Sequence, residues 1–276
     1  MVVYSQGGVG NQFFQFVYFL YLKSKGKNVL FDMGRVDYDS QHKGVTITDF
    51  IEIDDFNIIH SNNSNLPLLI RDDLISKCFR KYLRLIKKRK IVKSYYDYDG
   101  QASLESINSS LDTYVGYFQF VDSFILMKEE IERLLALKNS SLIEKYKNKY
   151  NGKTGLHIRR GDFLNTGHHV VGIEYIKQAI ARVSGDIVVF SDDISWCKDN
   201  IESDLRITFH EGSSALDDFV ALSQCTNYIL SGSTFSWCSA FIFSNKMTQV
   251  IIPSGHEAQF MSDTSNKKIG WNFTCL

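Results

Sequence analysis

Several ionisable side chains lie close together in the segment His157–Asp162 (HIRRGD), directly after a stretch that we expect to form a strand. Successive side chains of a strand point to opposite faces, so His157 and Arg159 should project to one face of the sheet. Ile158 and Arg160 should project to the other face. The apolar Ile158 can then anchor the strand while the two arginines meet an anionic group.

Arginine suits a phosphorylated ligand because its planar guanidinium stays charged and presents a fork of donors that matches phosphate oxygens. Two arginines beside a histidine therefore indicate a phosphate-binding site at this strand end. The same residues also fit an ion-pair network, in which Arg159 or Arg160 binds Asp162 and other acids, since charged groups often pair for structural reasons.

A glycine-rich turn, Gly7–Gln12 (GGVGNQ), joins an expected strand to a long apolar helix. Glycines let the backbone approach a ligand closely, and the free amides at a helix start favour an anion. A tight turn without a ligand fits the same residues. The candidate donor-binding residues of this turn are Gly8, Gly10, Asn11 and Gln12.

The turn also matches part of the dinucleotide fingerprint GxGxxG. Gly8 and Gly10 fit this pattern, but Phe13 stands where the third glycine belongs. Asp32 lies at the distance along the chain that is typical of a ribose-binding acid. A nicotinamide-dependent oxidoreductase therefore remains an alternative, and it would depend on Asp32 rather than on Arg159.

Two more polar segments follow expected strands. Phe190–Asp193 (FSDD) places two aspartates where open α/β sheets bind sugars or bases, although a helix cap explains them equally well. Leu230–Trp237 (LSGSTFSW) brings hydroxyls and free amides to a helix start, which can hold phosphate oxygens or simply cap the helix. No third metal ligand accompanies the aspartates, so we expect no metal. The candidate donor-binding residues of these two segments are Ser191, Asp192, Asp193, Ser231, Ser233, Thr234, Phe235 and Ser236.

The alternation of strands and helices predicts an α/β protein with two Rossmann-like lobes and a cleft between them. We place the N-terminal lobe at residues 1–150 and the C-terminal lobe at residues 151–276. The expected strands are 2–4, 29–31, 114–120, 154–158, 186–190, 207–209, 228–230 and 249–252. The expected helices are 11–24, 123–136, 142–150, 174–183, 194–200, 215–224 and 234–243. Residues 45–60 alternate only weakly, and we interpret them as a strand and turn that complete the first sheet.

Composition excludes several classes of protein. The 31 basic and 31 acidic residues cancel, which argues against a nucleic-acid partner, because such proteins are strongly basic. Five scattered cysteines form no metal-ligand or disulfide pattern, and this favours a reducing, cytoplasmic location. The sequence shows neither a secretion signal nor a stretch long and apolar enough to span a membrane.

One local charge run stands out against this neutral background. Nine Lys or Arg and no acid lie in the segment Lys77–Lys93, and the apolar residues Ile75, Phe79, Tyr82 and Ile86 recur at helical spacing between Asp72 and Lys93. A solvated helix face explains such a run most simply. The alternative is a basic amphipathic surface that contacts the inner face of the cytoplasmic membrane or a lipid-linked acceptor.

Three segments in this order resemble the α-1,2-fucosyltransferases of glycosyltransferase family 11. They are residues 7–15 (GGVGNQFFQ), 157–162 (HIRRGD) and 233–237 (STFSW), so the resemblance covers nearly the whole chain. The segments Phe190–Asp193 and Asp218–Cys225 also fit. Cys238 and Ser239 stand where the family usually has a second tryptophan and a small residue, and Gly232 replaces the usual asparagine.

The resemblance implies a GT-B-like fold and a metal-independent, inverting transfer of L-fucose from GDP-β-L-fucose. The acceptor would be O2 of a terminal galactose in an oligosaccharide or lipid-linked glycan, in the synthesis of a surface glycan or O-antigen. The donor would occupy the C-terminal lobe and the acceptor the N-terminal lobe. A transferase for another nucleotide sugar and a glycan-binding module without activity remain alternatives.

The resemblance also assigns roles to residues. Arg159 would bind the β-phosphate and stabilise the departing GDP, with Arg160 adding charge or holding the site together. His157 would share the donor pocket, and Ser233, Thr234 and Phe235 would grip the phosphates and the fucose. Asp162 is the nearest acid that could accept the acceptor's proton, or it could buttress the arginines. The candidate catalytic residues are therefore Arg159, Asp162 and His157.

Overall fold

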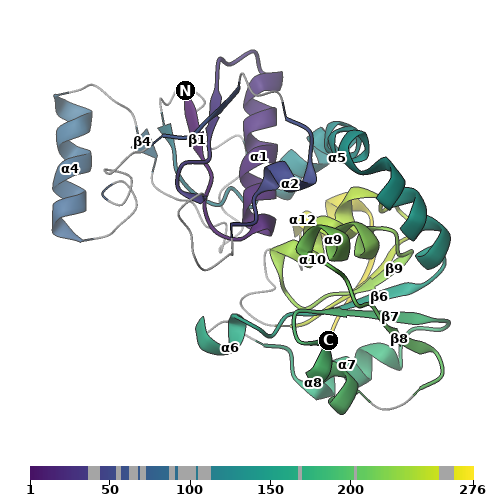
Figure 1. Ribbon diagram of the computed structural model, residues 1–276. Helices are drawn as coiled ribbons and strands as arrows, with labels where there is room; N and C mark the ends of the chain where they lie inside the picture. Colours follow the sequence, from purple (N-terminus) through teal and green to yellow (C-terminus); the bar gives the residue numbers. More distant parts are fainter. Residues whose placement is uncertain are drawn as a thin grey trace. The chain divides into compact units, whose positions relative to one another are not determined.

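The structure is a computed structural model, and the chain divides into two compact units, Met1–Leu134 and Leu135–Leu276. Each unit is built around its own parallel sheet (Figure 1). The described residues are 1–36, 44–53, 57–61, 68, 73–86, 91–92, 104, 113–166, 170–201, 204–254 and 264–276. The division lies inside helix α5 (Val121–Tyr150), whereas the sequence placed it at the end of this helix.

The sheet of the first unit has the strand order β3-β2-β1-β5-β4. Its strands are β1 (Val2–Tyr4), β2 (Leu30–Asp32), β3 (Ile58–Ile59), β4 (Ile91–Val92) and β5 (Thr113–Tyr114), and its helices before α5 are α1 (Val9–Ser24), α2 (Ile47–Phe50) and α4 (Leu74–Leu85). Helix α1 is buried around most of its circumference because its sequence is almost entirely apolar. Phe14 and Phe16 are fully buried, and Phe16 meets Phe31 of β2 edge to face. The expected βαβ opening is thus confirmed.

One expectation for the first unit needs correction. The strand expected at residues 114–120 ends at Tyr114, and Phe118 in the same segment has a φ of 48°, a left-handed conformation that is not extended. Residues 45–60, expected weakly as a strand and turn, contain the short helix α2 and the strand β3 at the edge of this sheet. The capping box of Thr46 and Asp49 starts α2, and this is the local signal that the sequence analysis overlooked.

The second unit contains a six-stranded sheet with the order β11-β10-β9-β6-β7-β8. Its strands are β6 (Thr154–Ile158), β7 (Ile187–Ser191), β8 (Ile207–Phe209), β9 (Asn227–Ile229), β10 (Gln249–Ile252) and β11 (Asn272–Cys275), all parallel to their neighbours. Its helices after α5 are α6 (Phe163–Thr166), α7 (Ile173–Ile180), α8 (Ile194–Asn200), α9 (Ala215–Ser223), α10 (Thr234–Ile242) and α12 (Thr264–Ile269). Helices α7 and α8 cover one face, and α9 and α10 cover the other (Figure 1). The doubly wound sheet is therefore confirmed.

Side-chain alternation along β6 matches the prediction. Leu156 and Ile158 lie in the apolar core beneath α7, together with Ile176 of that helix. His157 points the other way, toward Phe235 of α10, with 5.7 Å between the ring centroids. Gly155 lets α9 approach this face, because a Cβ there would lie 2.6 Å from Leu222 Cδ1.

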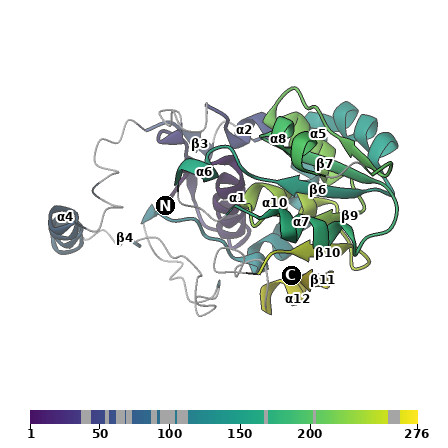
Figure 2. The ribbon, with the colours of Figure 1, turned by 90° about the horizontal axis from the view of Figure 1, so that it is seen from below.

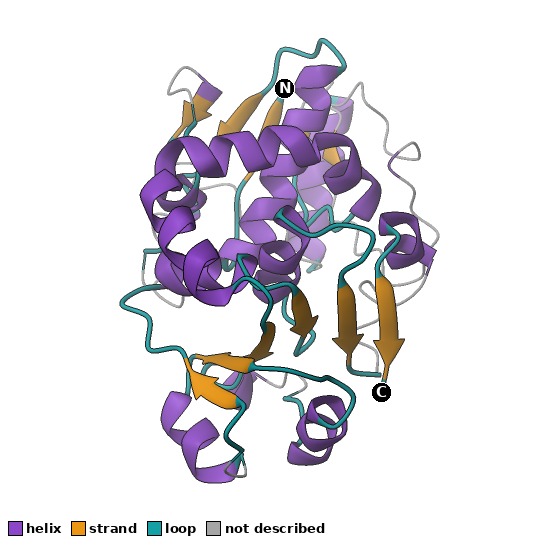
Figure 3. Cartoon of the chain, turned by 90° about the vertical axis from the view of Figure 1, so that its right-hand side faces the viewer, coloured by secondary structure: helices purple, strands orange, loops and turns teal. Residues whose placement is uncertain are grey.

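Some elements differ from the prediction at their ends or in number. The helices expected at residues 123–136 and 142–150 form the single helix α5, which carries non-helical dihedral angles at Asn139. Strand β11 and helix α12 were not predicted. They lie with β10 beside the C-terminus (Figure 2), and β10 and β11 run side by side in the same direction (Figure 3). Among the described helices, none is both long enough and apolar enough to cross a membrane.

Candidate functional site

Three neighbouring strands of the second unit, β9, β6 and β7, bring the polar segments of the sequence to one edge of the sheet. Because the strands are parallel, their carboxyl ends lie at the same edge, where open α/β sheets bind ligands. Arg159 follows β6, Asp192 follows β7, and Ser231 follows β9. The structure therefore assembles three of the four candidate segments, those from the second half of the chain, within a single unit.

Arg159 is held by two carboxylates from different segments. Its Nη2 lies 2.8 Å from Asp162 Oδ1, and its Nη1 lies 3.1 Å from Asp192 Oδ2. The guanidinium carbon also lies 5.7 Å from the centroid of the Phe163 ring. The Arg159 side chain nevertheless keeps 28 % of its surface exposed. Its position is thus fixed by charge-assisted hydrogen bonds while part of the group remains open to a ligand.

Arg160 is held in a different way. Its guanidinium stacks on the Trp196 ring of α8, with 3.6 Å between its central carbon and the ring centroid, and its Nε lies 3.4 Å from Asp193 Oδ2. Among the described residues, no ion pair engages its two Nη groups. The ion-pair network that was the structural alternative is therefore present. It fixes both arginines without using all of their donors.

Asp192 connects the ends of the two central strands. Its Oδ1 accepts a hydrogen bond of 2.9 Å from the backbone amide of Arg160, while its Oδ2 binds Arg159. This contact requires a glycine at position 161, because a Cβ there would lie 2.7 Å from Asp192 Oδ2. Asp193 caps α8 by accepting from the Trp196 amide, and its own amide donates to Ser191 Oγ. The expected capping role of this segment is thus observed beside its contacts with the arginines.

His157 lies at the buried side of this edge. Its Nδ1 is 3.0 Å from Ser231 Oγ. Burial lowers the pKa of His157 to about 4, a net value to which Asp192 contributes an opposing effect and the charge of Arg159 a further lowering effect. The imidazole is therefore neutral near pH 7, so it contributes a hydrogen-bonding group rather than a positive charge.

The serine-rich start of α10 is partly occupied by its own structure. Ser233 Oγ accepts from the Phe235 amide and caps the helix, and Ser236 Oγ donates to the Ser233 carbonyl. The preceding Gly232 has a φ of 77°, which favours glycine. Thr234 remains partly exposed, and no hydrogen bond of its side chain occurs among the described residues. The amide groups of this helix start and Thr234 are thus the groups available to an anion.

The fourth candidate segment lies in the first unit. Gly8 precedes α1 as its N-cap residue, and Gly10 is buried in the first turn. Asn11 Oδ1 accepts from Gln119 Nε2 at 3.0 Å. Gln12 braces the backbone, since its Nε2 donates to the Gly7 carbonyl and its Oε1 accepts from the Ile47 amide. Their donor-binding role remains a prediction.

Asp32, on which the nicotinamide alternative depends, is engaged elsewhere. The side chain is buried, and its Oδ1 accepts from the amides of Gly34 at 2.9 Å and Ser61 at 3.1 Å. Its Oδ2 accepts from the Ser61 hydroxyl. Both carboxylate oxygens therefore accept hydrogen bonds that join the ends of β2 and β3, which is a structural role for Asp32.

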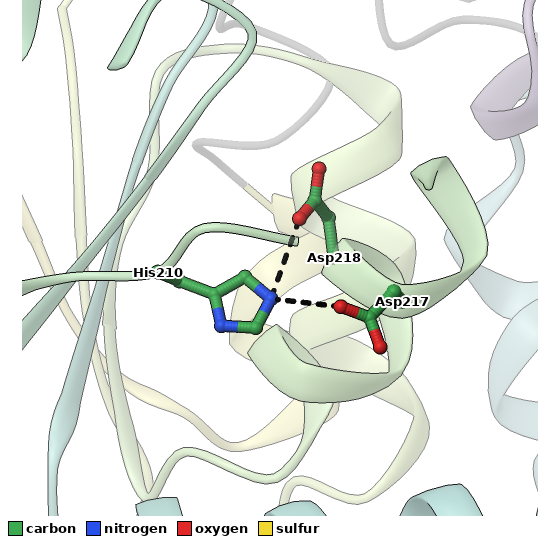
Figure 4. A group of neighbouring side chains, drawn as sticks. All are labelled: His210, Asp217 and Asp218. Carbon is green, nitrogen blue, oxygen red and sulfur yellow. Dashed lines mark ion pairs between the residues drawn. The ribbon is translucent and has the colours of Figure 1, made fainter. Parts of the chain in front are cut away.

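A cluster that the sequence analysis did not single out lies between the end of β8 and the start of α9 (Figure 4). His210 Nε2 is 3.4 Å from both Asp217 Oδ2 and Asp218 Oδ1. Tyr150 binds the other ring nitrogen at 2.7 Å, and Tyr146 donates to Asp217 Oδ1 at 2.7 Å. Only the spacing of His210 from the adjacent aspartates could have signalled the cluster. Among the described residues it is the group that could hold a divalent ion, since its ligand atoms lie within 4.8 Å of one another.

The protonation of this cluster follows from its burial. Burial, together with the nearby charges of Asp217 and Asp192, raises the pKa of Asp218 to about 7. Burial also lowers the pKa of His210. For Asp217, burial acts to raise the pKa, but hydrogen bonds from Tyr146 and the Ser213 amide bring it below its usual value. A proton on Asp218 can therefore be shared with the acceptor atoms that converge there, which belong to His210 and Asp217. Because Asp192 also raises the pKa of Asp218, the cluster is linked electrostatically to the arginine site.

Two α/β units with parallel sheets, one of them with arginines and hydroxyls at its carboxyl edge, have the architecture of the GT-B type of fold. Solved structures support this fold: fucosyltransferase NodZ from Bradyrhizobium has a TM-score of 0.51 and 13% sequence identity, over 87% of this chain and 92% of that chain. The chain belongs to glycosyl transferase family 11, whose family model matches residues 1–274. The expected family and fold class are thereby confirmed.

Characterised relatives come from bacteria and from animals. The O-antigen biosynthesis glycosyltransferase WbnK of Escherichia coli is 29% identical, over 90% of this chain and 91% of that protein. The alpha-1,2-colitosyltransferase of Escherichia coli is 24% identical, over 90% and 89%. Human galactoside alpha-(1,2)-fucosyltransferase 1 is 36% identical over 102 residues, which are 32% of this chain and 28% of that protein.

Proposed function

We propose that the protein transfers L-fucose from GDP-β-L-fucose, with inversion, to O2 of a terminal galactose. The acceptor is an oligosaccharide or a lipid-linked glycan, and the reaction serves the synthesis of a surface glycan or O-antigen. The observation that carries this proposal is the partly exposed Arg159, held by Asp162 and Asp192 at the carboxyl edge of the second sheet. The relatives named as an O-antigen glycosyltransferase and as α-1,2-fucosyltransferases support it.

The proposed chemistry needs positive charge at the leaving group. When the bond to fucose breaks, negative charge develops on the diphosphate of GDP, and fixed cations and amides can stabilise that charge. In this proposal Arg159 binds the β-phosphate, and Arg160 adds its Nη donors, which no ion pair engages among the described residues. Thr234 and amides of the α10 start bind from the other side. These groups supply the electrostatic stabilisation, so the proposed reaction requires no metal ion.

We assign Asp162 and Asp192 mainly to positioning. Both carboxylates bind the guanidinium of Arg159, Asp162 at 2.8 Å and Asp192 at 3.1 Å. Asp162 therefore serves the reaction best by fixing Arg159, together with Asp192. The neutral His157 and its partner Ser231 support the donor pocket from beneath. The transfer forms the bond from the acceptor O2 to fucose, breaks the bond from fucose to the β-phosphate, and releases GDP together with the proton of the attacking hydroxyl.

A transferase for another nucleotide sugar is the second candidate, and one observation favours it. The colitosyltransferase of Escherichia coli matches nearly the full length of this chain. Colitose is fucose without its 3-hydroxyl group, so both sugars would present the same diphosphate to the arginines. Turnover with GDP-fucose and with GDP-colitose on the same acceptor separates the two candidates.

The test of the proposed function is incubation with GDP-fucose and a panel of β-galactosides, with the product linkage determined by NMR. We expect an α-1,2-linked fucose on the terminal galactose. Arg159→Ala should abolish most turnover. The matched control is Arg133→Ala, which removes an exposed arginine from a similar i, i+3 ion pair, with Glu130. Products with another linkage, or an active Arg159→Ala enzyme, would contradict the proposal.

We also propose a cytoplasmic location, with access to lipid-linked acceptors at the inner face of the cytoplasmic membrane. The scattered free cysteines support a reducing compartment. A cell fractionation experiment tests this location, since the protein should divide between the cytosol and the inner membrane. Recovery in the periplasm would contradict it.

A further inference from the structure

Helix α4 of the first unit carries large apolar side chains on its solvent-exposed side. The exposed fractions are 76% for Leu74, 71% for Ile75, 44% for Tyr82, 68% for Leu85 and 65% for Ile86. A solvated helix face would place charged or polar groups at such positions. Helix α4 therefore departs from the simplest interpretation of the basic segment, which was a solvated face.

The other side of α4 holds the helix to its own unit. Phe79 and Leu83 pack against Tyr4 and Val115. Ser76 on the same side is buried, and Asp73 caps the helix by accepting from its amide. The helix is thus anchored along one side, and the exposed apolar residues form a separate face.

Positive charge borders this exposed apolar face. Lys77, Lys81 and Arg84 follow one another at spacings of four and three residues, so they form a row on one side of the helix. All three side chains are exposed, and helix α4 contains no acidic residue. Four more basic residues follow at positions 87–90 in the sequence, outside the described residues. An apolar face with a cationic border is the pattern of a helix that lies in a membrane interface.

We propose that the exposed face of α4 binds an anionic lipid bilayer, with Leu74, Ile75, Tyr82, Leu85 and Ile86 in the interface and the basic row facing the headgroups. The helix has 12 residues and is about 18 Å long, so it lies in the plane of the bilayer rather than across it. A second copy of the chain is a poorer occupant, because two such faces would bring their basic rows together. This inference goes beyond the proposed function, since lipid binding requires neither donor nor acceptor.

The test is flotation of the full chain with liposomes that contain phosphatidylglycerol and with liposomes of phosphatidylcholine alone. We expect binding to the anionic liposomes, with a strong decrease at high salt. Each cation near an anionic surface strengthens binding about fivefold. The variant Lys77→Gln/Lys81→Gln/Arg84→Gln should therefore bind roughly 100-fold more weakly.

A second variant tests the apolar face. Ile75→Glu/Leu85→Glu should lose flotation, because it places carboxylates where the side chains enter the interface. Its matched control is Leu205→Glu/Met247→Glu, which makes the same charge change at two exposed apolar residues of the second unit. This control should float like the unchanged protein. Circular dichroism of both variants checks that the fold is retained.

Three results would overturn the inference. The first is equal flotation with neutral and anionic liposomes, and the second is unchanged flotation of folded Ile75→Glu/Leu85→Glu. The third is an unchanged protein that binds no lipid and is a dimer in light scattering, while Ile75→Glu/Leu85→Glu is a monomer. That result would assign the exposed face of α4 to a second copy of the chain. Fucosyl transfer to a soluble galactoside is a separate measurement, so failure of the proposed function would be distinguishable from failure of lipid binding.

Discussion

Arg159 and Asp192 join the ends of two parallel strands, with 3.1 Å between Nη1 and Oδ2. Asp192 also accepts from the backbone amide of Arg160, so one carboxylate fixes a guanidinium and the loop that carries it. The site is therefore pre-organised by the protein itself. Pre-organised charge stabilises a transition state more effectively than charge that must first move into place.

Gly161→Ala should damage the site without unfolding the protein. The new Cβ would lie 2.7 Å from Asp192 Oδ2, and the carboxylate must shift away from Arg159. We expect turnover to fall about 10- to 100-fold, because small misplacements of catalytic groups have effects of this size. Gly172→Ala is the control, since a Cβ there meets no atom within 4 Å. Steady-state kinetics of Gly161→Ala and Gly172→Ala test this prediction. Equal activities of the two variants would show that turnover does not require the contact between Asp192 and Arg159.

Trp196→Ala should lower the affinity of the enzyme for the nucleotide-sugar donor. Arg160 stacks on this ring at 3.6 Å, and without the ring its guanidinium loses its defined position. We expect KM for the donor to rise about 3- to 10-fold, which corresponds to a cation-π contact of about 1 kcal/mol. Trp196→Phe keeps an aromatic face and should restore most of the affinity. If both variants raise KM equally, the stacking does not position Arg160.

His157 should reduce stability in mild acid. Its folded pKa is about 4, below the ordinary value of 6.5, so the unfolded chain takes up a proton first as pH falls. The contribution of the neutral His157 to the free energy of unfolding is therefore fully present above about pH 6.5. It declines by on the order of 3 kcal/mol as the pH falls toward about pH 4. In His157→Gln this part of the decline should disappear. Urea unfolding of both proteins across this window measures it, and parallel pH profiles would contradict the assignment.

The contribution of Asp218 to stability should decrease as pH rises, which is opposite to the contribution of His157. Its folded pKa is raised to about 7 from the ordinary value of 3.8, so the contribution to stability is present below about pH 4 and is lost as pH rises to about 7. Asp218→Asn removes this loss. The variant should gain on the order of 1 kcal/mol relative to the unchanged protein between about pH 4 and about pH 8, allowing for partial solvent screening.

The partner residue provides the contrast for this measurement. Asp217→Asn should destabilise the protein at neutral pH for two reasons. It weakens the hydrogen bond from Tyr146, and it removes a carboxylate whose lowered pKa shows that the fold favours its ionised form. Thermal unfolding at about pH 4 and at about pH 8 distinguishes Asp217→Asn from Asp218→Asn. A loss of stability in Asp218→Asn at about pH 8 would show that the carboxylate is ionised and stabilising there.

The regular part of the fold was predictable because its local signals are strong. The strands of the second unit alternate or are continuously apolar, and the structure places β6, β8 and β10 at the predicted bounds. β11 has four residues, of which two are partly buried, so its sequence signal is short, and its pairing with β10 defines it as a strand. Tertiary context thus decided this edge strand, whereas β8 at the other edge was predictable.

The same distinction applies to the site. Arg159, Asp192 and Ser231 were predictable because each follows a recognisable strand, and parallel strands end at one edge. The cluster of His210, Asp217 and Asp218 was not predicted, since its three groups converge only when β8 and α9 pack together. The basic amphipathic surface at α4 stood only as an alternative to a solvated face, because helical spacing shows that a face is apolar but not whether the fold covers it.

The most direct measurement is turnover of Arg159→Ala with GDP-fucose and a β-galactoside, with and without added guanidinium ion. If Arg159 stabilises the departing diphosphate, removal of its guanidinium should lower kcat about 100- to 1000-fold. Added guanidinium should restore part of this activity, and it should leave the unchanged enzyme and Arg133→Ala unaffected. A folded Arg159→Ala enzyme with unchanged kcat would contradict the central role of this residue.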